Sequence, residues 1–319
     1  MKKEEIPFYK FDSLSEAHRT FGLPLPKHPL ISIVNGIDEK IFLELGPHLH
    51  ALSFYKISFR PYFGGKLKYG QTYFDFDEGG LLFAAPNQII GKSEEELNAI
   101  PQGTCANQQI ILLIHPDFLW NFPLAKKIKQ YSFFSYSSRE ALHLSDEEKE
   151  VILSIFRMIE SELNNRIDEF SQEVVISQLE LLLNYANRFY KRQFITRKPV
   201  CHDMLQQLEE LLDTYFNQQA SLNQGIPTVK FLADQLNISS SYLSDMLRSM
   251  TGQNAQQLIH QKLIEKAKEK LSLTNLTISE IAYELGFEHP QSFSKLFKNK
   301  TQESPMEFRE KFKLSFSQN

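Results

Sequence analysis

Few side chains in this sequence are spaced for catalysis or metal binding. His48 and His50 are the best candidates, because imidazoles two residues apart on a strand point to the same face and could share a metal. No glutamate or third histidine follows at a suitable spacing, so partly buried or turn histidines are the simpler interpretation. Cys105 and Cys201 form no C-x-x-C pair, and we expect both to be reduced. The sequence offers no Ser/His/Asp set and no phosphate-cradling glycine loop. We therefore expect no catalytic residue, no metal and no cofactor.

Length and composition are those of a globular protein. The 319 residues are more than one core usually holds, which favours two domains. With 42% hydrophobic and 23% charged residues, the chain does not resemble a disordered protein. The longest aliphatic run, at residues 110–114, is too short to cross a bilayer. The N-terminal stretch MKKEEIPFYKF lacks the apolar core of a signal peptide. We therefore expect a cytoplasmic protein that does not enter a membrane.

Charge is distributed unevenly along the chain. The formal net charge is −4, but residues 228–319 contain 12 Lys and Arg against 10 Asp and Glu, which gives this region a net charge of +2. The excess has the sign expected of a region that binds nucleic acid, although it is smaller than nucleic-acid binders often carry.

One helix-turn-helix pattern occurs twice in this C-terminal region. The first copy reads VKFLADQLNISSSYLSDMLRSMTG, and the second reads ISEIAYELGFEHPQSFSKLFKNKT. The second turn is one residue longer, so matching positions lie 49 residues apart before the turn and 50 after it. The matching apolar positions are Leu232, Ala233, Leu236, Leu243 and Leu247 in the first copy and Ile281, Ala282, Leu285, Phe293 and Phe297 in the second. Two similar surfaces suit a repetitive partner, and the major groove of DNA returns about every 34 Å.

The second copy has the local chemistry of two tightly joined helices. Thr277 and Glu280 match a T-x-x-E capping box at the start of the first helix. Gly286 follows the end of that helix, where a left-handed conformation is favourable for a residue without a Cβ. Pro290 suits the first turn of the next helix. The alternative is an all-α packing module with no ligand, but the duplication favours DNA.

These residues resemble the AraC family of bacterial transcription regulators. The C-terminal signature of the family appears here as ISEIAYELGFEHPQSFSKLFKNKTQESPMEFR at residues 278–309, within a match that covers residues 228–309. The resemblance implies two helix-turn-helix units joined by a helix near residues 255–271. It places recognition helices near residues 240–250 and 290–300, in successive segments of the major groove. Gln302 departs from the pattern where glycine is usual, and Leu263 departs where arginine is frequent.

The resemblance also implies which side chains contact double-stranded DNA. The first recognition helix would present Ser241, Ser244, Asp245 and Arg248, and the second would present Gln291, Ser292, Ser294, Lys295, Lys298 and Lys300. Gln291 and Lys295 suit base contacts. Phosphate contacts are assigned to Arg248, Lys298 and Lys300. Asp245 stands where a basic residue is frequent, and it could accept only from a cytosine amino group. Any one of these residues could instead be a solvated surface residue. Arg309 is expected to cap the last helix.

The N-terminal half favours short strands followed by helices. Runs rich in aromatic and β-branched residues at 53–59, 67–76, 80–85 and 108–114 are separated by Gly and Pro-Asn turn signals, which indicates an antiparallel barrel or sandwich. After Ser145 the apolar residues recur at helical spacing. The stripes are Val151, Ile155, Ile159 and Leu163, then Val175, Leu179, Leu182, Ala186 and Tyr190. Such stripes form a core face or a surface through which two helices pair.

This half resembles the same family more weakly, which implies a cupin-like effector barrel. We therefore predict an α+β multidomain protein whose N-terminal antiparallel β-barrel precedes an all-α region. The expected domains are a regulatory barrel at 1–144, a helical dimerisation and linker region at 145–198, and a double helix-turn-helix domain at 199–319. A small effector would occupy the barrel interior, near His50, Tyr55, Arg60 and Tyr62.

The expected function is a sequence-specific DNA-binding transcriptional regulator, not an enzyme. Its N-terminal domain would control it through a small-molecule effector or through dimerisation. The expected partners are a promoter duplex, a second copy of the chain, the effector and RNA polymerase. The alternatives are a cupin-type metalloenzyme with an attached DNA-binding module, and a regulator that responds to a protein partner.

Overall fold

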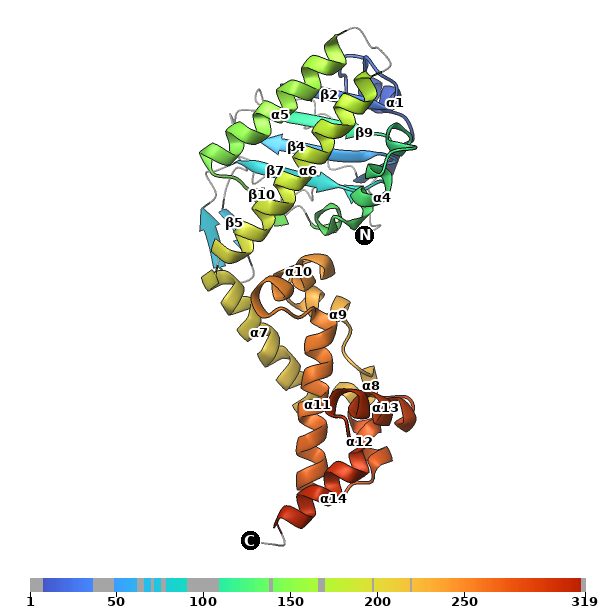
Figure 1. The fold of residues 1–319 in the computed structure, drawn as a ribbon, viewed down its shortest axis with the longest axis vertical. Helices are drawn as coiled ribbons and strands as arrows, with labels where there is room; N and C mark the ends of the chain where they lie inside the picture. Colours follow the sequence, from blue (N-terminus) through green and yellow to red (C-terminus); the bar gives the residue numbers. More distant parts are fainter. Residues whose placement is uncertain are drawn as a thin grey trace, which may run out of the picture. The chain divides into compact units, whose positions relative to one another are not determined.

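The computed structural model describes residues 8–36, 49–61, 66–69, 72–75, 79–90, 109–137, 140–165, 170–196, 198–218 and 220–316. The chain forms two compact units, residues 1–196 and residues 197–319 (Figure 1). His48, Tyr62 and Cys105 lie outside the described residues.

Short strands precede two long helices in residues 1–196. The strands are β1 Phe8–Phe11, β2 Ile31–Asn35, β3 Leu49–Leu52, β4 Tyr55–Arg60, β5 Lys66–Tyr69, β6 Thr72–Asp75, β7 Gly80–Ala84, β8 Ile89–Ile90, β9 Ile110–Ile114 and β10 Leu142–His143. The helices are α1 Leu14–Thr20, α4 Leu124–Lys127, α5 Asp146–Asn164 and α6 Ser171–Thr196, with 3-10 turns at Pro116–Leu119, Ile128–Gln130 and Ser132–Ser135. The predicted strands at 53–59, 80–85 and 108–114 are confirmed as β4, β7 and β9. Within the run at 67–76, the described residues form parts of β5 and β6, which pair antiparallel.

The described strands form three sheets and do not close into the predicted barrel. A five-stranded sheet has the order β10-β7-β4-β9-β2, a three-stranded sheet has the order β1-β3-β8, and β5 pairs with β6. Every pair in the five-stranded sheet is antiparallel, as predicted. The pairing of β1 with β3 is parallel, contrary to the all-antiparallel prediction. A parallel pair requires a long connection between its strands, and here that connection includes α1 and β2.

The five-stranded sheet is covered on both faces. Successive side chains of a strand point to opposite faces. Ile57 of β4 lies opposite Phe83 of β7 in the register, and the Phe83 ring is 6.2 Å from the ring of Tyr190 in α6. Figure 1 shows α5 and α6 lying across this face of the sheet. Lys56 points to the other face, where it lines a small cavity together with Leu52 of β3. The core of this unit therefore has a helical layer, the sheet, and the smaller sheet behind it.

The two long helices have the buried stripes that the sequence predicts. The Ser145 hydroxyl accepts from the Glu148 amide, and the Glu148 carboxylate accepts from the Ser145 amide, so α5 begins at a capping box. All five predicted stripe residues of α6 are buried. In α5, Ile155 and Ile159 are buried as predicted, whereas Val151 and Leu163 are only half-buried. The buried face of α5 is completed by Ile152 and Phe156 instead.

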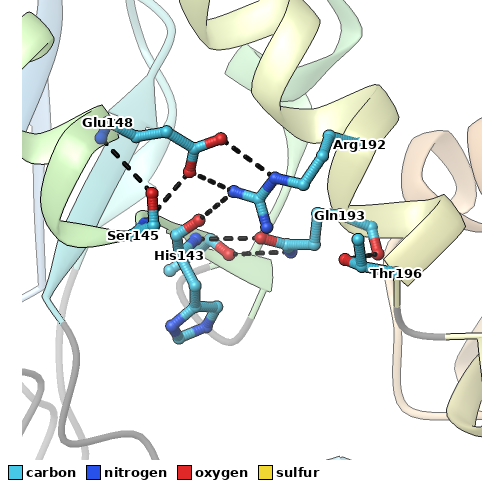
Figure 2. A network of polar contacts seen from close by, with 7 residues as sticks. His143, Ser145, Glu148, Arg192, Gln193 and Thr196 are labelled. Atoms are coloured by element: carbon cyan, nitrogen blue, oxygen red, sulfur yellow. Dashed lines mark hydrogen bonds and ion pairs between the residues drawn. The ribbon is translucent and has the colours of Figure 1, made fainter.

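Polar contacts join the last turns of α6 to β10 and to the start of α5 (Figure 2). Gln193 is fully buried; it accepts from the His143 amide at 2.9 Å and donates to the Ala141 carbonyl at 3.2 Å. Arg192 donates to the His143 carbonyl at 2.9 Å and to Glu148 Oε1 at 3.0 Å. Because Glu148 also belongs to the capping box of α5, this cluster ties three elements together at the C-terminal end of α6.

Replacing Gln193 by leucine should loosen this end of α6. The leucine would fill much of the same volume, but the His143 amide and the Ala141 carbonyl would lose their buried partner. We expect a loss of about 2 kcal/mol in local stability, seen as faster amide hydrogen exchange in residues 186–196. Arg157→Ala, which removes an exposed ion pair on α5, is the control and should change stability by less than about 0.5 kcal/mol. Unchanged exchange in Gln193→Leu would mean that the cluster contributes nothing.

The described part of residues 197–319 lies in helices and short loops. The helices are α7 Lys198–Asn217, α8 Ala220–Gln224, α9 Val229–Gln235, α10 Ser240–Thr251, α11 Ala255–Leu273, α12 Ile278–Glu284, α13 Pro290–Thr301 and α14 Pro305–Phe316. The predicted connecting helix is α11, which begins at a capping box formed by Asn254 and Gln257. The predicted recognition helices near 240–250 and 290–300 are α10 and α13. The capping box of Thr277 and Glu280 is present at the start of α12.

Candidate nucleic-acid interface

The pairs α9–α10 and α12–α13 are two copies of one structure, and they form the first and second helix-turn-helix units. In the first copy the amide of Ile238 donates to the carbonyl of Ala233 at 3.0 Å. In the second copy the amide of Phe287 donates to the carbonyl of Ala282, also at 3.0 Å. Ala233 and Ala282 are matched positions of the sequence repeat. The same backbone bond therefore closes both turns, so the sequence repeat is also a structural repeat.

Each turn contains one residue in the left-handed region. Asn237 has φ 56° in the first turn, and Gly286 has φ 89° in the second. Asparagine is among the side chains that tolerate this region best, and glycine enters it freely. At Gly286 space is also restricted, because a Cβ there would lie 2.5 Å from the carbonyl carbon of Gly225. The predicted left-handed role of Gly286 is confirmed.

Apolar side chains hold each pair of helices together. The matched core positions are all buried: Leu232, Ala233, Leu236, Leu243 and Leu247 in the first unit, and Ile281, Ala282, Leu285, Phe293 and Phe297 in the second. In the second unit the rings of Phe293 and Phe297 are 5.8 Å apart, and Phe297 also meets Phe308 of α14 at 5.7 Å. With one face of α10 and α13 fixed in this way, the opposite face is the surface on which contacts can be made.

The predicted contact residues lie on these opposite faces with different exposure. On α13, Gln291, Ser292, Lys295, Lys298 and Lys300 are exposed, and Ser294 is half-buried. On α10, Arg248 is exposed, whereas Ser241, Ser244 and Asp245 are half-buried. The second helix therefore offers a more accessible polar face than the first.

Two charged residues have partners that the sequence did not indicate. Arg248 Nη1 donates to Asp245 Oδ1 at 2.8 Å, so two of the four predicted DNA contacts of α10 pair with each other. Arg309 was expected to cap the last helix. Its Nε instead donates to the carbonyl of Leu271 at 3.3 Å, which joins α14 to the last turns of α11. Arg309 reaches α11 because α14 packs against that helix.

The C-terminal ends of α10 and α13 also match. Gly252 ends α10 with φ 75°, and Gln302 ends α13 with φ 67°, so both C-cap residues are left-handed. Each follows a threonine, Thr251 or Thr301, whose hydroxyl bonds a carbonyl four residues earlier. Glycine is the usual residue at such a cap, and Gln302 therefore occupies a conformation that disfavours its side chain.

Replacing Gln302 by glycine should stabilise the second unit. The substitution removes the cost of a side chain in the left-handed region and gives up one exposed bond from Gln302 Nε2 to the Asn299 carbonyl. We expect a gain of about 1 kcal/mol in the free energy of unfolding, measured by urea denaturation. Gly252→Ala is the matched control of opposite sign. A Cβ there would meet nothing within 4 Å, so the expected loss comes from the backbone alone. No gain in Gln302→Gly would contradict the cap interpretation.

A segment that precedes both units supports the second one. Ser221 of α8 donates to the carbonyl of Glu284 at 2.5 Å, at the end of α12. The backbone of Gly225 lies against Gly286 in the turn that follows. The hydroxyl of Tyr215 in α7 holds the Gly225 carbonyl at 2.9 Å. Sequence reasoning missed Ser221 and Gly225, because their contacts with Glu284 and Gly286, far away in the sequence, leave no local pattern.

Two lysines of the connecting helix share one carboxylate of α7. Lys262 donates to Asp213 at 2.8 Å, and Lys266 lies 3.7 Å from the same carboxylate. The hydrogen bond from Lys262 lowers the pKa of Asp213 below its usual value. These lysines therefore fasten α7 to α11 and add little to the positive surface of the unit.

The predicted effector residues that the structure describes, His50, Tyr55 and Arg60, are not gathered in one place. His50 lies on β3 and faces a cavity of about 30 Å³ that is otherwise mostly apolar. Tyr55 and Arg60 stand at opposite ends of β4, and strand alternation places them on opposite faces of the sheet. The Tyr55 ring packs on Phe134 at 5.1 Å, and burial raises the pKa of its hydroxyl. Ligand pockets usually measure about 300–1,000 Å³, so this cavity is far smaller than an effector site of that kind.

The part of the chain that the structure describes holds neither a metal cluster nor a membrane-spanning helix. No three His, Cys, Asp or Glu side chains gather there as a metal site would require. None of the helices described combines the length and apolar character needed to span a membrane.

Comparison with known proteins places the C-terminal region in a family. A helix-turn-helix domain model matches residues 232–311. An uncharacterised HTH-type transcriptional regulator of Staphylococcus aureus strain MSSA476 is 28% identical over 138 residues, which are 43% of this chain and 17% of that protein. The chain thus spans about a sixth of the length of the curated relatives it matches.

Two solved structures are similar to the same region. The C-terminal domain of the two-component response regulator yesN from Fusobacterium nucleatum is 35% identical, with 32% of this chain and 96% of that chain covered and a TM-score of 0.28. The C-terminal domain of AraT, a response regulator from Geobacillus stearothermophilus, is 30% identical, with 34% and 84% covered and a TM-score of 0.30. By the matched residues, the C-terminal region of the chain is a helix-turn-helix domain of the AraC type, similar to the corresponding region of HTH-type transcriptional regulators.

Proposed function

We propose that this protein binds duplex DNA at promoter sites and regulates transcription, with α10 and α13 in successive segments of the major groove. The observation that carries the proposal is the structural repeat, in which one backbone bond closes both turns and both second helices keep a polar face outward. The major groove admits an α-helix, and helix-turn-helix proteins place their second helix there. The match of residues 232–311 to the helix-turn-helix model supports the same function.

Charge favours the second unit as the stronger DNA contact. Helix α13 carries three exposed lysines, Lys295, Lys298 and Lys300, and no acidic residue. Lysines at these positions can pair with phosphates and position the helix. On α10 the single arginine, Arg248, is paired with Asp245. We therefore expect the second unit to supply most of the salt-dependent affinity.

Selection of bound duplexes from a random-sequence library by the full chain tests the proposal. We expect the recovered duplex to bind about a thousandfold or more tightly than unrelated DNA, with an affinity that falls steeply as salt rises. Equal affinity for all duplexes, or no binding at low salt, would contradict the proposed function.

Lys295→Ala should weaken specific binding and relax one position of the recovered site. Lys295 is exposed on α13, one turn beyond Gln291, and can donate to guanine acceptors. The expected loss is about 1–3 kcal/mol, measured by titrating duplexes that differ at single base pairs. Gln235→Ala, at an exposed position on α9 of the other unit, is the control. Unchanged affinity and unchanged preference would remove Lys295 from the interface.

Residues 1–196 offer a surface on which a second copy could pair. A shallow groove of about 370 Å³ lies along α5 and α6, lined by Met158, Phe170, Glu173, Val174, Ser177, Gln178 and Leu181. Four of these are unusually exposed for apolar residues: Phe170 at 62%, Met158 at 42%, Leu181 at 41% and Val174 at 40%. Exposed apolar patches of this kind mark interaction surfaces.

Charge along α6 favours an antiparallel arrangement of two copies. The exposed Glu173 lies near the N-terminal end of the helix, and the exposed Arg188 and Lys191 lie near its C-terminal end. A two-fold axis across α6 would set each acidic end against the basic end of the partner, whereas a parallel pair would place like charges together. Pairing, or an effector that binds the N-terminal unit, would control how the DNA-binding units are presented.

A further inference from the structure

The exposed face of α10 carries one close pair of opposite charges. Arg248 Nη1 donates to Asp245 Oδ1 at 2.8 Å, and residues three apart share one face of a helix. The Asp245 side chain is 19% exposed, whereas that of Arg248 is 59% exposed. A guanidinium has five N–H donors, and this bond uses one of them. The carboxylate therefore stays close to the helix while the guanidinium extends outward.

This pairing makes Arg248 a poor phosphate contact. A phosphate is attracted by net positive charge, and the Asp245 carboxylate at 2.8 Å cancels most of the attraction that Arg248 would exert. The carboxylate itself also repels phosphate. Arg248 would have to leave Asp245 in order to bind the DNA backbone with its full charge. On α13, by contrast, the lysines have no acidic neighbour on their own helix.

The same pairing suits contacts to base edges. A carboxylate that holds a guanidinium fixes the plane of its fork, which lowers the entropy cost of a bidentate contact. Arginine donates in this way to O6 and N7 of guanine, and a carboxylate accepts from the amino group of cytosine. Asp245 also draws Arg248 toward the N-terminal half of α10, which is the end of a recognition helix that contacts bases.

We propose that Asp245 and Arg248 form a single specificity element that recognises a G·C-containing step, with Arg248 on guanine and Asp245 on cytosine. Arg248 is thereby moved from the phosphate contacts to the base contacts. This inference rests on the proposed DNA-binding function, and it adds the base composition that the first unit selects.

Salt titrations of the full chain on its selected duplex separate the two roles of Arg248. A phosphate contact contributes about 0.9 to the slope of log affinity against log salt, whereas a base contact made by a neutral pair contributes little. We expect Arg248→Ala to leave this slope unchanged and to lower the preference for guanine at one position by about tenfold. We expect Asp245→Asn to remove the preference for cytosine and to steepen the slope by about one, because the freed Arg248 can then bind phosphate.

Two control variants calibrate the measurement. Lys298→Ala on α13 should lower the slope by about 0.9, and Arg157→Ala, which breaks a similar exposed ion pair on α5, should change neither slope nor preference. A lower slope in Arg248→Ala with an unchanged base preference would overturn the inference and leave the proposed function intact. An absence of salt-dependent binding by the unaltered chain would overturn both.

Discussion

Replacing Gly286 by alanine is expected to disable the second helix-turn-helix unit. The φ of 89° costs a residue with a Cβ about 1–2 kcal/mol. The Cβ would also lie 2.5 Å from the Gly225 carbonyl carbon and 2.8 Å from the Ile226 nitrogen, and neither backbone atom can move aside cheaply. Overpacking of this kind costs about 1–3 kcal/mol more. The turn between α12 and α13 would have to open, and α13 would lose its fixed presentation.

Amide hydrogen exchange in residues 278–301 of the full chain measures this effect. We expect the local opening free energy to fall by about 3 kcal/mol in Gly286→Ala, together with a loss of most specific DNA binding. Gly252→Ala is the matched control, because its φ is 75° but a Cβ there meets nothing within 4 Å. It should lose only about 1 kcal/mol. Equal effects in the two variants would show that contact with Gly225 is unimportant.

The C-terminal unit could be predicted closely because its determinants are local. Capping residues such as Thr277 and Glu280, the left-handed glycine at 286 and the apolar spacing of the repeat all act within a few residues. The support of the second turn by Ser221 and Gly225 could not be predicted, because it joins positions far apart in the sequence.

The contact face of α10 was only half predictable. Helical spacing placed Asp245 and Arg248 on one face, but the choice between solvent, DNA and each other depends on side-chain rotamers, which a spacing pattern does not contain.

In the N-terminal unit, strand patterns predict single strands but not how those strands pair. The strands at 53–59, 80–85 and 108–114 were recognisable from composition and turn signals, since each needs only its own residues. Their assembly into separate sheets depends on pairing between distant segments. The parallel pairing of β1 with β3 is one example, because it depends on how the connection through α1 and β2 returns the chain to β1. Tyr55 and Arg60 lie on opposite faces of β4 because side chains alternate along a strand and these two are five residues apart.

Replacing Leu181 by glutamate should separate two paired copies and weaken DNA binding. Leu181 lines the groove along α5 and α6 and is 41% exposed, so the isolated chain can accept a charge there at little cost. In a two-fold dimer the apolar groove of the partner would cover that charge, and burying an unpaired charge is strongly unfavourable. Loss of the second chain would remove the gain from linked binding, and we expect affinity for the selected duplex to fall about 100-fold. Sedimentation equilibrium and duplex titration together measure the two effects.

Charge reversal along α6 tests the antiparallel arrangement itself. Glu173→Lys alone would place like charges at both ends of the pair and should weaken dimerisation, whereas Glu173→Lys combined with Arg188→Glu and Lys191→Glu restores opposite charges at each end. A parallel pair would gain nothing from the combined change, since like charges would still face each other. Ile89→Glu, at an exposed apolar position on β8 outside the groove, should leave both dimerisation and DNA affinity unchanged. If Leu181→Glu yields a monomer that binds the selected duplex as tightly as the unaltered chain, the two helix-turn-helix units of one chain are sufficient, and α5 and α6 have no part in DNA binding.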